Sequence, residues 1–112
     1  MSEAPPLSAA ALVEAVDRLA DRFRSMPQSR LLAGVPGHPS RAGAGLALAR
    51  SLAAAALELE GEPPREVPDA GPFAVGDQLA VAGHDLVIAA HDRPEAVAAA
   101  LAAVRETERL TN

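Results

Sequence analysis

Residues 76–92 repeat with a period of seven positions, and this repeat constrains the fold more than any other feature of the sequence. Aligned on that period, the segment reads GDQLAVA, GHDLVIA and AHDRPEA, so that small residues and polar pairs recur in register. Seven residues make nearly two turns of an α-helix, which places each class of residue on its own stripe. A β-hairpin has no reason to keep that period. The repeat therefore predicts a helix over about residues 72–91.

A β-hairpin over about residues 78–90 is the alternative structure for this segment. Two apolar runs, QLAVA and LVIAA, are separated by Gly83, His84 and Asp85, as two short strands would be separated by a turn. Strict alternation fails, however, because each face of such strands would mix polar with apolar residues. A glycine inside a helix costs about 1 kcal/mol relative to alanine. Gly76 and Gly83 therefore keep an α+β fold open as the second possibility.

Three further helices are predicted from capping residues and from apolar residues that recur at helical spacing. Serine and aspartate are favoured N-cap residues, and a glycine commonly ends a helix. The expected helices and their N-caps are residues 8–25 with Ser8, residues 40–60 with Ser40 and residues 93–110 with Asp92. Gly61 is the expected end of the second of these helices. A short helical turn, capped by Ser25 and stopped by Gly34, is expected between the first two.

The chain of 112 residues has the length of one domain, and its core must be thin. Phe23 and Phe73 are its only aromatic residues, while 27 residues are alanine, which buries little surface. A thin core is usually compensated by close helix packing or by a partner subunit. We expect an all-α single domain over residues 1–112, an up-and-down four-helix bundle. Its N-terminus should be frayed over residues 1–7, and residues 61–71 should form a Pro-rich crossover.

The composition excludes several classes of protein. Cysteine is absent, so the chain has no disulfide, no thiolate metal site and no catalytic thiol. The first 30 residues lack a basic start followed by an apolar run, so no signal peptide is predicted and the cytoplasm is the expected compartment. All ten basic residues are arginine, and together with the many alanines this indicates a GC-rich bacterial genome.

Charge is unevenly distributed along the chain, whose net charge is −5. Residues 18–50 carry +5 and residues 51–112 carry −7. The two segments are expected to attract each other within the fold or across a dimer; alternatively, the basic one faces an anionic partner. Weak nucleic-acid binding through residues 18–50 is one such hypothesis. The acidic balance and the lack of stacking aromatics argue against it.

The predicted helix over residues 40–60 is apolar nearly all round. Between Ala42 and Leu57 only Arg50 and Ser51 are polar. A membrane span is rejected, because Ala and Gly contribute little insertion energy and a charge near the middle costs about 2.5 to 3.5 kcal/mol. A helix without a polar face lies in the centre of a bundle or at a subunit interface. We therefore expect a homodimer or a protein partner, with interface residues Gly43, Gly45, Ala49, Leu52, Ala53 and Ala56.

Two sets of side chains are candidate binding residues. His38, Ser40 and Arg41 precede and open the helix over residues 40–60, where free backbone N–H groups attract anions. No P-loop and no dinucleotide-binding GxGxxG pattern accompanies them, so a small anionic ligand is the expectation. The second set, Asp77, His84 and His91, lies on one stripe of the helix predicted over residues 72–91.

The stripe of Asp77, His84 and His91 does not have the spacing of a metal site. A helix rises about 1.5 Å per residue, so neighbouring members are about 10.5 Å apart. Two ligands of one zinc ion each lie only about 2 Å from it. We therefore predict no metal and no cofactor, but a polar seam that lies against solvent, the crossover or a partner.

No arrangement of residues predicts an enzyme. The chain has no GxSxG motif, and no pair of groups is spaced so that one would activate the other. The leading hypothesis is a small non-enzymatic helical interaction or accessory protein that acts through self-association or partner binding. The alternative is a regulatory module that binds a small anionic ligand near the N-terminus of the helix over residues 40–60.

Overall fold

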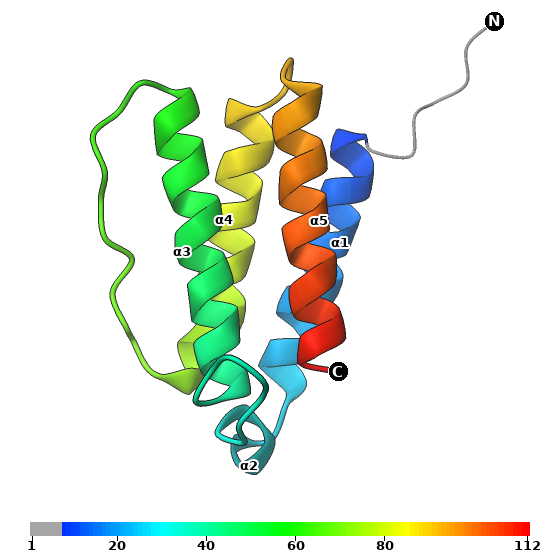
Figure 1. Cartoon of the computed structure of the whole chain (residues 1–112), viewed down its shortest axis with the longest axis vertical. Helices are drawn as coiled ribbons and strands as arrows, with labels where there is room; N and C mark the ends of the chain where they lie inside the picture. Colours follow the sequence, from blue (N-terminus) through cyan, green and yellow to red (C-terminus); the bar gives the residue numbers. More distant parts are fainter. Residues whose placement is uncertain (1–7) are drawn as a thin grey trace, which may run out of the picture.

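The computed structural model describes residues 8–112, and these residues form a helical bundle (Figure 1). Two short elements connect its long helices, namely α2 (Gln28–Leu31) and the 3-10 turn η1 (Pro72–Ala74). The long helices are α1 (Ala9–Ser25), α3 (Arg41–Leu59), α4 (Val75–Ala89) and α5 (Pro94–Leu110). The predicted all-α bundle is confirmed. The alternative hairpin is wrong, because its residues lie in α4, and the predicted frayed segment 1–7 lies outside the described residues.

The crossover, residues 60–71, sets the directions of the helices. It runs the length of the bundle from the end of α3 to η1, so α3 and α4 point the same way while α1 and α5 point the other way (Figure 1). In the predicted up-and-down order each helix reverses the direction of the one before it, and α3 and α4 would have been antiparallel. Two side chains hold the crossover: Arg50 Nε donates to Val67 O and Gln78 Nε2 donates to Pro68 O, both at 2.9 Å.

Three of the predicted helix boundaries are confirmed by their hydrogen bonds. Ser8 and Ser40 are N-caps whose hydroxyls accept a bond from the backbone N–H three residues on, at 3.1 and 2.9 Å. Gly61 ends α3 with a φ of 69°, a left-handed conformation that glycine adopts without strain. The N–H of Glu62 then reaches back to Leu57 O at 2.9 Å, which completes a Schellman motif.

Two predicted N-caps are wrong, and proline explains both. A residue before proline is pushed out of the α conformation. Met26 precedes Pro27 and is extended, so the break falls at Met26 and Ser25 belongs to α1, where its hydroxyl donates to the carbonyl of Asp21. Arg93 precedes Pro94 and is likewise non-helical, with φ −123° and ψ 79°. Arg93 therefore takes the N-cap position in place of Asp92, and no side chain caps α5.

The core lies between the four long helices and is built from Leu, Val and Ala. Phe23 is buried in it, whereas Phe73 is 66% exposed. The largest fully buried apolar side chains are Leu12, Val16, Leu19, Leu31, Leu79, Leu86, Leu101 and Val104. α3 is long and apolar enough to cross a membrane, with a mean hydropathy of 1.3, and half of that stretch is buried in the bundle. The buried part of α3 packs against its neighbours in the bundle.

Candidate functional site

The small residues of the α4 repeat lie against α1. A β-carbon at Gly83 would stand 2.5 Å from Val16 Cγ1, and one at Gly76 would stand 2.8 Å from the backbone oxygen of Ala20. Contacts this short exclude any larger side chain at either position without displacement of α1. Glycine at every seventh residue therefore lets the two helices approach closely along one face of α4.

The polar members of the repeat bind α1 across the same contact. Arg24 Nε donates to Asp77 Oδ1 at 2.8 Å, and His84 Nε2 lies 2.7 Å from Asp17 Oδ1. Asp17 and Arg24 are themselves seven residues apart on α1. The two helices are antiparallel, so one heptad spacing matches the other. The neighbour of the predicted polar seam is thus a helix of the same chain.

His91 does not belong to this seam. α4 ends at Ala89, and the predicted helix end at residue 91 is wrong, because the chain turns there before Pro94 begins α5. The imidazole is largely exposed, with Nδ1 3.8 Å from Asp92 Oδ1. Only Asp77 and His84 of the predicted stripe therefore contact α1.

The predicted anion site lies at the start of α3, and two of its three side chains are already engaged. The hydroxyl of Ser40 caps α3, and Arg41 Nε donates to the backbone oxygen of Thr111 at 3.2 Å. His38 pairs through its backbone with Val35, whose carbonyl accepts a bond from the His38 N–H at 3.1 Å. An anion at this end of α3 would have to compete with the contact that Arg41 makes.

Arg22, in the basic segment, donates hydrogen bonds to the C-terminal end of α5. Arg22 Nη2 donates to Glu108 O at 2.8 Å and to the hydroxyl of the fully buried Thr111 at 2.6 Å. Burial lowers the pKa of Arg22, and the positive charges of Arg30, Arg41 and Arg18 lower that pKa further against the raising effect of Glu108. The carbonyls at a helix C-terminus carry partial negative charge, which attracts such cations.

The basic and acidic segments also attract each other through side chains. Arg18 Nε lies 2.9 Å from Glu108 Oε2. This hydrogen bond and the accompanying charge raise the pKa of Arg18 and, against a smaller effect of burial, lower that of Glu108. The uneven charge of the sequence is thus partly balanced inside the chain.

Most of the predicted interface residues of α3 pack within the bundle. Gly45, Ala49, Leu52 and Ala56 are buried, and Gly43 and Ala53 are half-buried. A β-carbon at Gly45 would stand 2.6 Å from Val75 Cγ1. The small residues of α3 therefore serve contacts with this chain's own helices, and the face of α3 left exposed carries Ala47, Arg50, Ser51, Ala54 and Glu58.

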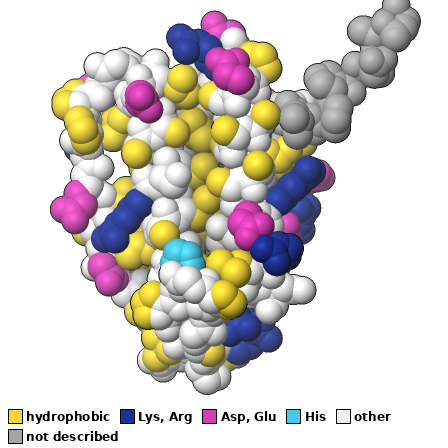
Figure 2. Space-filling view, viewed as in Figure 1, with side chains coloured by type: hydrophobic (Ala, Val, Ile, Leu, Met, Phe, Trp, Pro, Cys, Tyr) yellow, Lys and Arg dark blue, Asp and Glu magenta, His cyan; other side chains and the backbone are white. Residues whose placement is uncertain are grey.

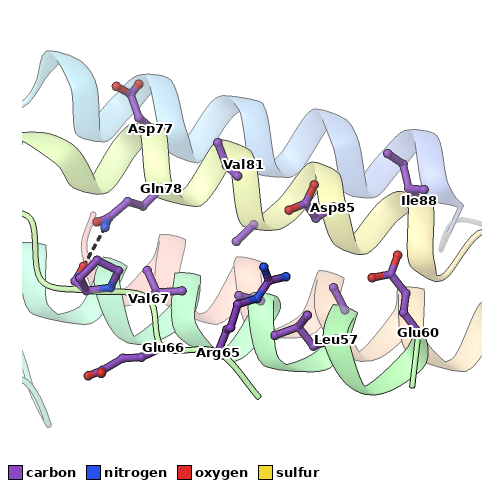
Figure 3. Close-up of a pocket in the computed structure, with 14 residues that line it drawn as sticks. Leu57, Glu60, Arg65, Glu66, Val67, Asp77, Gln78, Val81, Asp85 and Ile88 are labelled. Atoms are coloured by element: carbon purple, nitrogen blue, oxygen red, sulfur yellow. Dashed lines mark hydrogen bonds between the residues drawn. The ribbon is translucent and has the colours of Figure 1, made fainter. Parts of the chain in front are cut away.

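A groove of about 650 Å³ opens between α3, α4 and the crossover (Figure 3). We call it the α3–α4 groove. Its volume lies in the range of sites that bind small molecules or anchoring side chains. Its apolar lining includes Ala53, Ala56, Leu57, Val67, Val81 and Ile88. A second groove of about 240 Å³, half of whose lining residues are alanine, lies between α3 and α5 on the face seen in Figure 2.

Val81 and Ile88 form the exposed apolar wall of the α3–α4 groove. Their exposed fractions are 63% and 69%, the highest of any large aliphatic side chains among residues 8–112. Large contiguous apolar patches on a surface mark interaction sites, and these two side chains stand beside a groove with further apolar lining. Both residues occupy the same position of the heptad repeat, and this signal was available in the sequence. It was missed because the repeat was interpreted through its polar and small positions.

The charged side chains around the α3–α4 groove are mostly acidic. Asp77 is held by Arg24 on α1. Glu60, Glu66 and Asp85 form no ion pair with any described residue, and Arg65 is the one cation among the described lining residues. Gln78 donates to Pro68 through Nε2, while its Oε1 is buried without a hydrogen-bond partner in the described chain.

Neither metal chemistry nor similarity to known proteins adds to this description. Within residues 8–112 no three His, Cys, Asp or Glu side chains lie close enough to hold one metal ion. Comparison of the chain with protein-family models, with curated proteins and with solved structures gives no match. Function is therefore inferred from the groove and its chemistry.

Proposed function

We propose that the protein is a small non-enzymatic binding module that holds an apolar segment of a partner protein in the α3–α4 groove. The observation that carries this proposal is the exposure of Val81 and Ile88 beside a cavity of about 650 Å³. Fully burying a side chain of this size contributes about 1.5 to 3 kcal/mol. A partner that covers both residues would gain most, but not all, of this free energy for each, because each side chain is already partly buried.

The chemistry of the lining favours binding over catalysis. The described lining residues include no Ser, Thr, His or Tyr, so the common nucleophiles and general bases other than carboxylates are missing from it. The carboxylates of Glu60, Glu66 and Asp85 are exposed to solvent. Exposed carboxylates suit electrostatic recognition of a partner.

A homodimer through α3 receives less support than a partner in the groove. The bundle buries most of the small residues that were expected at a dimer interface, and what α3 leaves exposed includes Arg50 and Glu58. A second copy would find more apolar surface at Val81 and Ile88 than along α3. The sequence predicts self-association, whereas a partner in the groove predicts a monomer when the protein is alone in solution, and light scattering distinguishes the two.

Titration with the neutral dye Nile red tests whether the groove accepts an apolar body. The dye emits more strongly, and at shorter wavelength, when it is bound in an apolar site. Wild-type protein should bind it, and Val81→Asp should abolish the signal while the helical circular dichroism is unchanged. Leu32→Asp is the matched control, because Leu32 is 53% exposed and lies outside the groove.

The control fixes the interpretation of the dye experiment. Dye binding that survives Val81→Asp, or that Leu32→Asp removes equally, would place the apolar site elsewhere and contradict the proposal. Absence of any dye signal from the folded wild-type chain would contradict it as well.

A further inference from the structure

We infer that the segment bound in the α3–α4 groove is a basic amphipathic helix, with apolar side chains two turns apart and Lys or Arg beside them. This inference rests on the proposed function and names the class of partner. Three features of the groove carry it: the backbone of the crossover, the spacing of the apolar wall and the charge of the rim.

The crossover disfavours a partner in extended conformation. An added β-strand needs a row of free N–H and C=O groups on its host. Residues 62–71 include three prolines, which have no N–H. The carbonyls of Val67 and Pro68 already accept bonds from the side chains of Arg50 and Gln78. A helix satisfies its own backbone and needs none of these groups.

The apolar wall has the spacing that a docked helix presents. Val81 and Ile88 are seven residues apart on α4, which corresponds to two turns and about 10.5 Å. A helix laid along the groove offers apolar residues at i, i+3 or i+4, and i+7 over the same distance. The alanines Ala53, Ala56 and Ala82 line the groove with short side chains and leave room for longer ones from a partner.

The charged residues along the edge of the groove, which we call the rim, favour a partner that carries positive charge. Figure 3 shows Asp85 between Val81 and Ile88 along α4, with Glu60 near the Ile88 end. Glu66 on the crossover adds a third carboxylate. None of the three forms an ion pair with a described residue, and Arg65 is the one cation among the described lining residues. Lys or Arg residues beside the apolar face of a helix would complement this rim, and acidic ones would be repelled.

Two synthetic peptides of about 15 residues test the inference, a length sufficient for helix formation on binding. Both carry leucine at the same helical positions; one has Lys and the other Glu at the remaining exposed positions. Calorimetric titration of the full chain should show the Lys peptide binding about tenfold more tightly, since several exposed ion pairs contribute small amounts that add. The preference should weaken as salt is raised.

Variants distinguish the contribution of the acidic rim to peptide binding from the contribution of the apolar wall. Asp85→Asn with Glu60→Gln should remove most of the preference for the Lys peptide, while Asp92→Asn, an exposed carboxylate outside the groove, should leave it intact. Ile88→Ser should weaken both peptides. Equal affinity for the two peptides in wild-type protein that binds Nile red would overturn the inference and leave the proposed function standing.

Two further outcomes would assign the groove to another occupant. A Lys peptide with prolines that prevent helix formation should bind more weakly; equal binding would overturn the helical partner. Light scattering should show a monomer before peptide is added. A dimer that Ile88→Ser dissociates would place a second copy of this chain in the groove and overturn the inference as well.

Discussion

Gly83 of α4 lies so close to Val16 of α1 that a β-carbon at position 83 would stand 2.5 Å from Val16 Cγ1. This contact fixes which face of α4 turns inward. The face that carries Gly76 and Gly83 is closed against α1, and the face that carries Val81 and Ile88 is consequently left open to the α3–α4 groove. One face of α4 therefore packs closely against α1, and another face of the same helix lines the open groove.

Gly83→Ala should destabilise the fold although alanine is the better helix former. Alanine would gain about 1 kcal/mol in helix propensity, but the added methyl overlaps a β-branched side chain that has little rotamer freedom. Overpacking of this kind costs about 1 to 3 kcal/mol, so the net change should be destabilising. Urea denaturation measures the free energy of unfolding.

Val16→Ala provides the partner variant for this prediction. It removes the two methyl groups that clash, so Gly83→Ala should cost less in a Val16→Ala background than in wild type. Additive effects of the two substitutions would show that Gly83 and Val16 are not in contact.

Thr111→Val should destabilise the end of α5, because it removes a hydroxyl that accepts from Arg22 at 2.6 Å and donates to Thr107 O at 2.7 Å. The half-buried Arg22 would lose one of its two acceptors, and a fully buried donor left without a partner, at about 1 to 3 kcal/mol, sets the upper limit of the cost. Thr111→Ser keeps the hydroxyl and should retain more stability than Thr111→Val. Thermal unfolding ranks the two variants, and equal losses would show that the hydroxyl contributes nothing.

Acid should weaken the link between α1 and α5 through Glu108. The hydrogen bond from Arg18, opposed by partial burial, holds the pKa of Glu108 below its ordinary value of 4.5 in the folded chain. A carboxyl whose folded pKa is depressed contributes stability that is fully present above the unfolded value and is lost as the pH falls through the folded value. The expected contribution is below about 1 kcal/mol, because Arg18 is 55% exposed.

Glu108→Gln isolates this contribution. The free energy of unfolding of the variant should differ from wild type at pH 7 and converge with it as the pH falls below the folded pKa of Glu108. Arg18→Gln should produce the same convergence. A constant difference across the acid range would contradict the assignment.

Two aliphatic residues of α4 that are two positions apart should differ greatly in the stability lost on truncation. Leu86 is 1% exposed, so Leu86→Ala should cost about 2 to 5 kcal/mol through lost contacts and a cavity. Ile88 is 69% exposed, so Ile88→Ala should change stability by about 0.5 kcal/mol or less. Chemical denaturation measures both, and a large loss for Ile88→Ala would mean that it is a core residue.

The heptad repeat and the N-caps Ser8 and Ser40 predict the helices well, because each rests on interactions within one or two turns. Ser25 and Asp92 fail as caps for an equally local reason, since the prolines at 27 and 94 displace the helix starts by their effect on the preceding residue. His91 fails with them, because the same turn before Pro94 ends α4 two residues early.

The groove could not be predicted from such local signals. It exists because the crossover lets α3 and α4 run in parallel, and the path of a proline-rich segment is set by contacts such as Arg50 with Val67 that no periodicity reveals. The bond between Arg22 and Thr111 joins residues at opposite ends of the sequence. The charge difference between the two segments predicts attraction but does not name the pair.

Amide chemical-shift mapping of the full chain, titrated with the lysine peptide, tests the groove most directly. Binding in the groove should shift the amides of Val81, Asp85 and Ile88 on α4 and of Leu57 on α3, and should leave the α1 face of α4 unchanged. Shifts centred on His38 and Arg41, or no saturable shifts at all, would contradict a binding function for the α3–α4 groove.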